Sequence, residues 1–318
     1  MALFQTKKIQ SFIVFIIVLA AILWVFQDNF LKLSGFQKNS EKKAFINDIV
    51  EENNYLEKID NFFLKEYSKK QVLLNTINAE TYYSYKNAPI QLLDVKVKTY
   101  DKAKKVAAVL TSNRAEILKS GEIFFTGEVN IKTKNGVSHE LDTEVLIVIS
   151  DNEVIKSNKE ITYLGETARI TSEGMKMNID SDTMHLNGDV KIYQDSGAIL
   201  DTKNLYISHN AGEKIYKSKE KTVYRSNDTI VKSENGIDMN MNIHLINLLG
   251  KVEVISKSGG VLKSSNVLID QSNDGEIITS NNPSYFNSDT VDIKAKKMHY
   301  DAITKKLELM NNVEAIYE

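Results

Sequence analysis

The chain has 318 residues with an almost balanced charge, since 40 Lys and Arg stand against 42 Asp and Glu. This balance lacks the basic excess of a typical nucleic-acid binder, so no nucleic-acid partner is expected. Cysteine is absent and histidine occurs only 5 times, which excludes disulfide frameworks, zinc ribbons, thiol nucleophiles and histidine-rich metal sites. With 42% apolar and 26% charged residues, the chain is expected to fold.

The N-terminal segment predicts a membrane anchor. Residues 9–26 are almost entirely apolar and, as a helix rising about 1.5 Å per residue, would span roughly 27 Å, close to the hydrocarbon thickness of a bilayer. Lys7 and Lys8 precede this run, so the positive-inside rule places residues 1–8 in the cytoplasm and the bulk of the chain on the far side. A cleaved signal peptide is the alternative, although its apolar core is usually shorter.

Residues 27–61 predict a linker followed by an amphipathic helix. From about residue 41 to residue 63, apolar side chains recur at helical spacing, namely Phe45, Ile49, Leu56, Ile59 and Phe63. We interpret this segment as a surface helix or stalk, and a helix that binds a specific partner is the alternative.

From residue 62 onward the hydrophobic pattern changes to a period of two. Apolar and polar residues alternate, for example over residues 175–180 and 239–245, and Asn-Gly or Gly-Gly pairs separate such runs. Because successive side chains of a strand point to opposite faces, these runs predict strands with one apolar face. Little helix is expected after residue 65.

The alternating region is an internal repeat with steps of 61 or 62 residues. A valine that follows a short turn-like pair recurs at Val129, Val190, Val252 and Val313. A serine, with an aromatic side chain six residues later, recurs at Ser157, Ser218 and Ser280. A leucine two positions before a hydroxyl side chain recurs at Leu141, Leu200 and Leu262. Three markers on one period make the repeat a strong signal.

The repeat predicts the fold class. One strand cannot bury its apolar face alone, so neighbouring repeats are expected to stack. Successive antiparallel strands, four to a period, would form two facing sheets with their apolar sides inward. The predicted fold is mainly β, an elongated open β-jelly roll or taco-like two-sheet antiparallel solenoid, preceded by one N-terminal transmembrane helix.

The inward face is the candidate binding site, since flexible methionine side chains suit variable apolar ligands. The candidate groove residues are Val129, Ile131, Met175, Met177, Ile179, Val190, Ile192, Met239, Met241, Ile243, Val252 and Val254. A packed sandwich core is the alternative role for these residues.

The last alternating segment, residues 313–318, predicts a strand with no polar capping unit beyond it. Its unpaired backbone N–H and C=O groups would accept a strand from a partner. The candidates for this partner edge are Val313, Ala315 and Tyr317. Ordinary fraying is the alternative.

Motifs for catalysis are missing. The sequence has no Gly-rich phosphate loop with Lys-Ser/Thr, no H-E-x-x-H motif and no nucleophile elbow. We therefore expect no enzyme activity, no catalytic residue, no metal and no cofactor.

The order of several short motifs resembles the LptC family, the periplasmic C component of the lipopolysaccharide export machine. The predicted anchor is followed by the motifs at 62–66, 77–80, 92–97, 110–116 and 125–131, and the segment from 171 to 190 is similar to the closing strands of that family. The resemblance implies an LptC-like β-jelly roll over residues 62–193. From about Gln194 the chain departs from that pattern, and residues 194–318 resemble the OstA-like A component, LptA.

The resemblance implies a protein of lipopolysaccharide transport. Such a protein is anchored in the inner membrane by a single pass, N-terminus cytoplasmic, beside the ABC transporter subunits of the exporter. It binds acyl chains between its two sheets and passes the lipid by edge-strand pairing to an A-type bridge protein or the outer-membrane translocon. The additional repeats would lengthen the groove by roughly 20 Å. An anchored structural β-solenoid scaffold without lipid cargo is the alternative.

Overall fold

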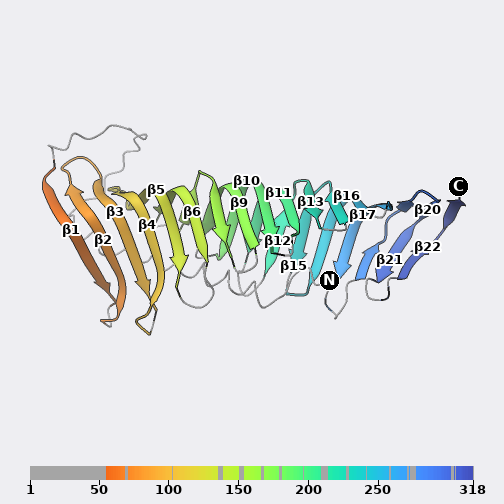
Figure 1. Cartoon of the computed structure of the whole chain (residues 1–318), viewed down its shortest axis with the longest axis horizontal. Coiled ribbons are helices and arrows are strands. Elements are labelled where there is room, and N and C mark those ends of the chain that lie inside the picture. The colour runs from red at the N-terminus through yellow and green to blue at the C-terminus, as the bar shows by residue number, and fades with distance from the viewer. Residues whose placement is uncertain are drawn as a thin grey trace. The chain divides into compact units, whose positions relative to one another are not determined.

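A computed structural model of the chain contains 23 strands among the residues that it describes, β1 to β23 (Figure 1). The described residues are 55–68, 71–101, 103–134, 139–149, 154–165, 168–178, 181–195, 197–208, 214–226, 229–240, 242–257, 259–270, 272, 277–301, 304 and 306–317. The expected mainly β fold is confirmed, and its antiparallel strands are those of a β-jelly roll. The predicted anchor at 9–26 and most of the predicted linker and helix lie outside the described residues.

The described residues form two compact units. Unit 1 comprises those up to residue 166 together with those of 174–180, and unit 2 comprises those of 167–173 and 181–318. The sequence-based boundary between residues 193 and 194 stays a prediction.

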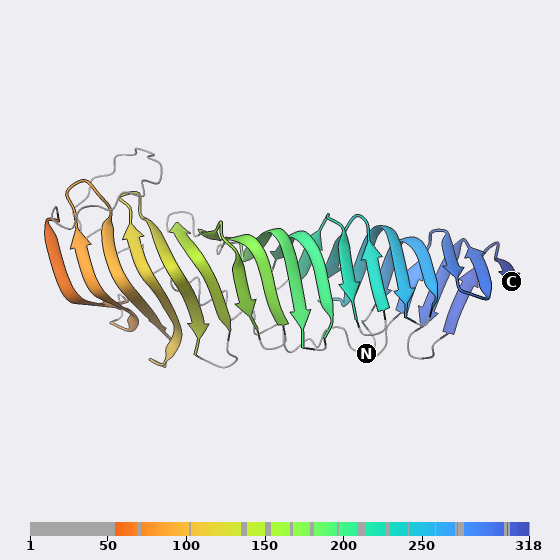
Figure 2. The same cartoon turned by 45° about the horizontal axis from the view of Figure 1, so that its top comes forward.

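Unit 1 begins with long antiparallel strands, each paired with the next along the chain. The strands are β1 (Glu57–Tyr67), β2 (Leu73–Ser84), β3 (Ile90–Tyr100), β4 (Val106–Ile117), β5 (Glu122–Thr133) and β6 (Glu140–Ile149). The short strands β7 (Val154–Ser157) and β8 (Ile161–Leu164) both pair with β6, and β7 also pairs with the later part of β9 (Ala168–Asn178). Figure 2 shows the long strands of this unit curving along their length.

β1 corrects the prediction of a helix that extends to residue 63. Residues 57–67 form a strand paired with β2, and Phe62, Leu64 and Glu66 alternate with more exposed neighbours. The helical spacing was misleading because Asn61 has a positive φ of 54°, which shifts the alternation by one residue. Ile59 and Phe62 therefore share a face of the strand although they are three positions apart.

In unit 2 the chain crosses the sheet four times in each period, as the sequence predicts. Two of these four crossings are single long strands, and each of the other two is divided into two short strands. In the first period the long strands are β10 (Thr183–Gln194) and β11 (Ile199–Ser208). The divided crossings are β12 (Ile215–Ser218) with β13 (Thr222–Arg225), and β14 (Thr229–Ser233) with β15 (Ile237–Asn240).

The second period of unit 2 has the same order. Its strands are β16 (Leu245–Ser256), β17 (Val261–Asp270), β18 (Ile277–Ser280), β19 (Ser284–Asn287), β20 (Val291–Ala295) and β21 (Lys297–Asp301). The strands β22 (Lys306–Met310) and β23 (Glu314–Tyr317) follow, paired with β21 and β20 respectively.

Each long strand of unit 2 contributes to two half-sheets. The first residues of β11 pair with β13 and its last residues with β12, and β17 pairs in the same way with β19 and β18. β10 and β16 change register beside Gly188 and Gly250, which have φ values of 69° and 73°. Glycine adopts this conformation without steric cost, and the resulting bulge bends the strand. Because the same face is buried in both arms, the half-sheets face one another.

The three repeat markers meet in space. Val129 lies opposite Thr143, Val190 opposite Thr202 and Val252 opposite Ser264 across neighbouring strands. The leucine and aromatic markers also pair, as Leu141–Tyr163, Leu200–Tyr224 and Leu262–Phe286. The repeat in the sequence therefore corresponds to a repeat of equivalent backbone positions within each unit.

A buried hydroxyl pair marks the bend in every period. The hydroxyl oxygens of Thr143 and Ser157 are 3.0 Å apart, those of Thr202 and Ser218 2.9 Å, and those of Ser264 and Ser280 2.8 Å. Each of the three serines also accepts a hydrogen bond from the backbone N–H two residues later. These bonds satisfy polar groups that burial would otherwise leave without partners, and so they explain why serine recurs at this position.

Candidate functional site

The inward face of unit 2 carries a continuous row of apolar side chains on one half-sheet. Each member is the cross-strand partner of the next. The row consists of Met184, Ile207, Tyr216, Met239, Ile246, Ile269, Ile278, Tyr300 and Leu307. Burial raises the pKa of the Tyr216 hydroxyl far above its ordinary value of 10.0. A tyrosine of ordinary pKa is already uncharged at neutral pH, and burial strengthens this preference at Tyr216.

The facing half-sheet of unit 2 carries a second row built in the same way. It consists of Ile192, Leu200, Tyr224, Val231, Val254, Leu262, Phe286, Ile293 and Ala315. Most of these side chains are only half-buried. A β-sheet in water normally buries such a face, so this partly exposed apolar row is the accessible part of the inward surface.

Unit 1 has equivalent rows, but their side chains are almost all buried. One row consists of Leu64, Ile77, Val97, Leu110, Ile131, Leu141 and Tyr163. The other consists of Ile90, Ile117, Ile123, Val148, Ile155 and Met177. All of these except Leu64 are buried, and Val97, Leu110, Ile131 and Met177 are each 0% exposed. The side chains of unit 1 themselves fill its interior.

The candidate groove residues fall into four groups. The buried members are Val129, Ile131, Met175, Met177, Val190, Met239 and Val252. Ile192 and Val254 are half-buried and belong to the second row of unit 2. Ile243 lies in the turn between β15 and β16 and is 52% exposed, because β15 ends at Asn240 although the alternation in the sequence continues. Ile179 and Met241 lie outside the described residues.

The sequence reasoning missed several inward residues. Tyr224 and Phe286 belong to the second row of unit 2, yet only their place in the repeat was recognised. The period supplied a signal, because Tyr224 and Phe286 occupy the position of the buried Tyr163. Assigning the same inward orientation to equivalent positions in every period would have identified them.

The expected partner edge is exposed. Tyr317 is 78% exposed and Val313 49% exposed, and Val313 precedes β23. Ala315 pairs with Ile293 and is also exposed. Within the described part of the chain, β23 pairs only with β20.

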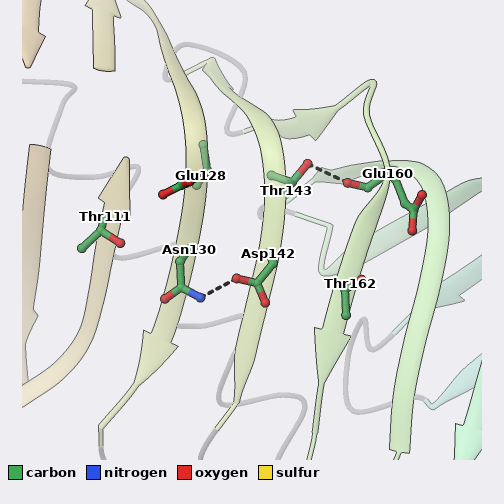
Figure 3. A pocket seen from close by; sticks show the side chains of 8 residues that line it. Thr111, Glu128, Asn130, Asp142, Thr143, Glu160 and Thr162 are labelled. Atoms are coloured by element: carbon green, nitrogen blue, oxygen red, sulfur yellow. Dashed lines mark hydrogen bonds between the residues drawn. The ribbon is translucent and has the colours of Figure 1, made fainter. Parts of the chain in front are cut away.

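A hollow in unit 1 is lined mainly by polar side chains, together with the buried candidate groove residue Val129 (Figure 3). Thr111, Asn130, Asp142 and Thr162 are successive cross-strand partners at its floor, and Glu128 and Glu160 add carboxylates. Hydroxyl, amide and carboxylate groups make up most of this lining, and Val129 is its apolar member.

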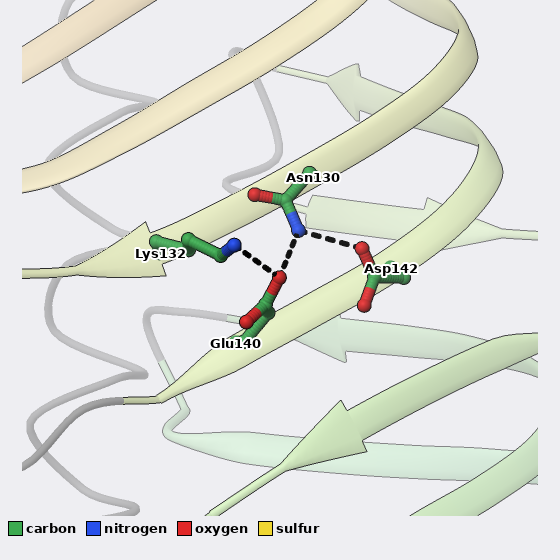
Figure 4. A network of polar contacts seen from close by, with 4 residues as sticks. All are labelled: Asn130, Lys132, Glu140 and Asp142. Atoms are coloured by element: carbon green, nitrogen blue, oxygen red, sulfur yellow. Dashed lines mark hydrogen bonds and ion pairs between the residues drawn. The ribbon is translucent and has the colours of Figure 1, made fainter.

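The hollow is continuous with a network of polar contacts (Figure 4). The Asn130 amide donates to Glu140 Oε1 and Asp142 Oδ1, each at 2.6 Å, and Lys132 Nζ lies 2.7 Å from Glu140 Oε1. Burial alone would raise the pKa of Glu140, but Lys132 and Asn130 outweigh it and lower that pKa below 4.5. Three or more potential metal-binding side chains do not gather at any point of the described residues.

The comparisons with known proteins bear on both units. The family model described as lipopolysaccharide-assembly, LptC-related matches residues 13–195 and 212–318. No curated protein matches the chain. Within the described part of the structure, none of the elements is a helix of the length and hydrophobicity that crossing a membrane requires. Since the matched segments cover most of the sequence and the described part has the antiparallel β architecture, this chain belongs to the LptC-related family of lipopolysaccharide-assembly proteins.

Proposed function

We propose that this chain binds acyl chains of lipopolysaccharide between the facing half-sheets of its units and passes the lipid to the next component of a transport bridge. Family membership implies a role in lipopolysaccharide transport, and the family is one of bridge proteins rather than a known enzyme family. The observation that carries the proposal is the second inward row of unit 2, an unbroken series of apolar side chains from Ile192 to Ala315, most of which are half-buried.

The physical basis is the transfer of methylene groups out of water. Each buried CH₂ contributes about 0.8 kcal/mol, so several acyl carbons laid along the row offset the conformational entropy that a mobile chain loses on binding. Equivalent positions along the row carry similar residues in the two periods of unit 2: Val254 corresponds to Ile192, and Phe286 corresponds to Tyr224. Successive positions therefore bind with similar free energy, and a lipid can move between them without a deep trap.

Unit 1 differs because its own side chains occupy the inward face. Ile131 and Met177, which are 0% exposed, leave no surface for a ligand. An acyl chain occupies this unit only after its half-sheets separate. The proposal therefore assigns the open acyl-binding surface to unit 2 and a gated one to unit 1.

The membrane topology and the partners complete the proposal. Residues 9–26 would anchor the chain in the inner membrane with residues 1–8 in the cytoplasm and the bulk in the periplasm, beside the ABC transporter subunits of the exporter. The exposed edge at Val313, Ala315 and Tyr317 would add a strand from an A-type bridge protein or an outer-membrane translocon. Residues 194–318 would take over part of the bridge that A-type subunits otherwise form.

A matched pair of aromatic residues on one strand tests the proposal. Phe286 is inward and half-buried, and Tyr285 is outward and 47% exposed. A photoreactive phenylalanine analogue placed at residue 286 of the full chain should capture lipopolysaccharide in cells, and the same analogue at residue 285 should not. Equal capture at both positions, or capture at residue 285 alone, would contradict binding between the half-sheets. Absence of capture at both would favour the structural scaffold.

A further inference from the structure

One row on the inward face of unit 1 is largely polar, although the row beside it is apolar. Glu66 lies opposite Asn75, Asn75 opposite Thr99, Thr99 opposite Ala108 and Ala108 opposite Thr133. The row two residues away on each strand is Leu64, Ile77, Val97, Leu110 and Ile131. Because side chains two apart in a strand share a face, the polar row lies beside the apolar row on the inward face.

The members of this row are buried. Glu66 is 7% exposed, Asn75 3% and Thr99 2%. Side chains of these types are rarely buried to this extent unless their polar atoms are hydrogen-bonded. Their burial beside a row of leucine, isoleucine and valine is the anomaly to be explained.

Two oxygen atoms of the row have no hydrogen-bond partner. Asn75 donates its amide N–H to Glu66 Oε2 at 3.1 Å, but its own Oδ1 accepts no bond. The Oγ1 of Thr99 also lacks a partner. The hydroxyl of Thr133 in the same row, by contrast, accepts a bond from the backbone N–H of His139 at 2.8 Å.

The two unpartnered atoms define the chemistry of a ligand. Asn75 Oδ1 only accepts a hydrogen bond, whereas the Thr99 hydroxyl can donate one. These residues are direct cross-strand partners, so their side chains lie within about 5 Å of each other. An alcohol hydroxyl that donates to Asn75 and accepts from Thr99 satisfies both at once, and an aliphatic chain attached to it would lie along the adjacent row of Ile77 and Val97.

We propose that Asn75 and Thr99 form a polar recognition point in unit 1 for an acyl chain that carries a hydroxyl group. This inference rests on the proposed function, because it assumes that acyl chains occupy the inward face. It adds selectivity, since an unsubstituted chain would bury the two oxygens without satisfying them, and buried polar groups left unpaired oppose binding.

The test uses two photoreactive fatty acids of equal length that differ only in a β-hydroxyl group, added to the full chain in lipid nanodiscs. The native protein should be half-saturated by the hydroxylated probe at a concentration about five- to tenfold lower than by the unsubstituted probe. Thr99→Val, which is nearly isosteric, and Asn75→Leu should each remove this preference while capture of the unsubstituted probe persists.

Thr76→Val is the matched control. Thr76 is next to Asn75 on the opposite face of β2, where its hydroxyl lies 3.4 Å from that of Tyr100. This variant should retain the preference. Equal half-saturation by both probes in the native protein, as expected if a water molecule alone occupies the row, would overturn the inference but leave the proposed function standing. Capture of neither probe would overturn both.

Discussion

The two units use one repeat but differ in how completely their inward faces are buried. Ile131 of unit 1 is 0% exposed, whereas the equivalent Ile192 and Val254 of unit 2 are half-buried. Tyr163 is buried, whereas Tyr224 and Phe286 at its position are not. The same alternation of apolar residues therefore supports either a filled core or an accessible surface, and the sequence period alone does not determine which.

The largest expected difference between the units concerns core substitutions. Phe125 is 0% exposed in unit 1, so Phe125→Ala should lower the free energy of unfolding by about 3–5 kcal/mol. Phe286→Ala should cost only about 1–2 kcal/mol, because part of that ring already contacts water. Urea denaturation of the full chain, with hydrogen exchange to assign each transition to a unit, measures both. A Phe286→Ala loss equal to that of Phe125→Ala would contradict the comparison.

Glycine-to-alanine substitution at the end of the bend should instead destabilise unit 2 more than unit 1. A Cβ added at Gly236 in unit 2 would lie 2.0 Å from the backbone oxygen of Ser218, at a φ of +91°. At the equivalent Gly174 of unit 1 the corresponding distance, to the backbone oxygen of Ser157, is 2.8 Å and φ is not in the left-handed region. Gly236→Ala should therefore destabilise its unit by roughly 3–5 kcal/mol and Gly174→Ala by roughly 1–3 kcal/mol.

Hydrogen exchange in β12 and in β7 would report these two losses separately. Gly259→Ala serves as the control, since its φ is +101° but the nearest atom to an added Cβ is 3.9 Å away. It isolates the cost of the backbone conformation. A Gly236→Ala variant no less stable than Gly259→Ala would show that the close approach to Ser218 is relieved by a small backbone shift.

Chemical labelling can sharpen the comparison directly, because the native chain has no cysteine. A cysteine at residue 254 should react with a maleimide at least about tenfold faster than one at residue 131, where labelling requires a local opening of the buried face. Added lipopolysaccharide should slow the reaction at residue 254. Similar rates at both positions would mean that the two faces open equally often.

The smallest expected difference is in acid stability. Lys232 donates to Glu253 at 2.7 Å and lowers the pKa of that carboxyl below 4.5. A carboxyl with a lowered pKa stabilises the folded state above its unfolded pKa, and this contribution is lost as the pH falls through the lowered value. Lys232→Met should therefore reduce the loss of stability on acidification by a few tenths of a kcal/mol, since the pair is partly exposed.

Lys132→Met in unit 1 should have a similarly small effect, because Asn130 continues to donate to Glu140 after the lysine is removed. Lys263 likewise remains beside Glu253 in the unit 2 variant. Unfolding measured from neutral pH to about pH 3 would compare the two variants. A larger change for Lys132→Met would indicate that the amide of Asn130 does not hold the carboxylate by itself.

The sequence predicted the fold class and the period because both depend on local alternation. The markers at Val190, Ser218 and Tyr224 recur since each occupies one position relative to the bend. β1 was not predicted from Glu57 onward, because the positive φ of Asn61 shifts its alternation and produces an apparent helical spacing. Such a local left-handed conformation is a backbone feature that the identities of the apolar residues do not encode.

The site was predicted only in part for a similar reason. Ile192 and Val254 were assigned to the inward face, but their partners Leu200 and Leu262 were treated only as repeat markers. The polar row of Glu66, Asn75 and Thr99 gave no sequence signal, since its members come from three strands and meet only through their register. Burial also depends on packing between the half-sheets, which no single strand specifies.

The bulges at Gly188 and Gly250 have a mechanical consequence. The long strands of unit 2 run through both half-sheets, so the half-sheets cannot separate as two independent sheets would. Widening the gap requires torsion at the bulges, and the hydrogen bonds between strands transmit this torsion to neighbouring positions. A ligand bound between the half-sheets at one position would therefore also widen the gap at the next position, so opening is coupled along unit 2.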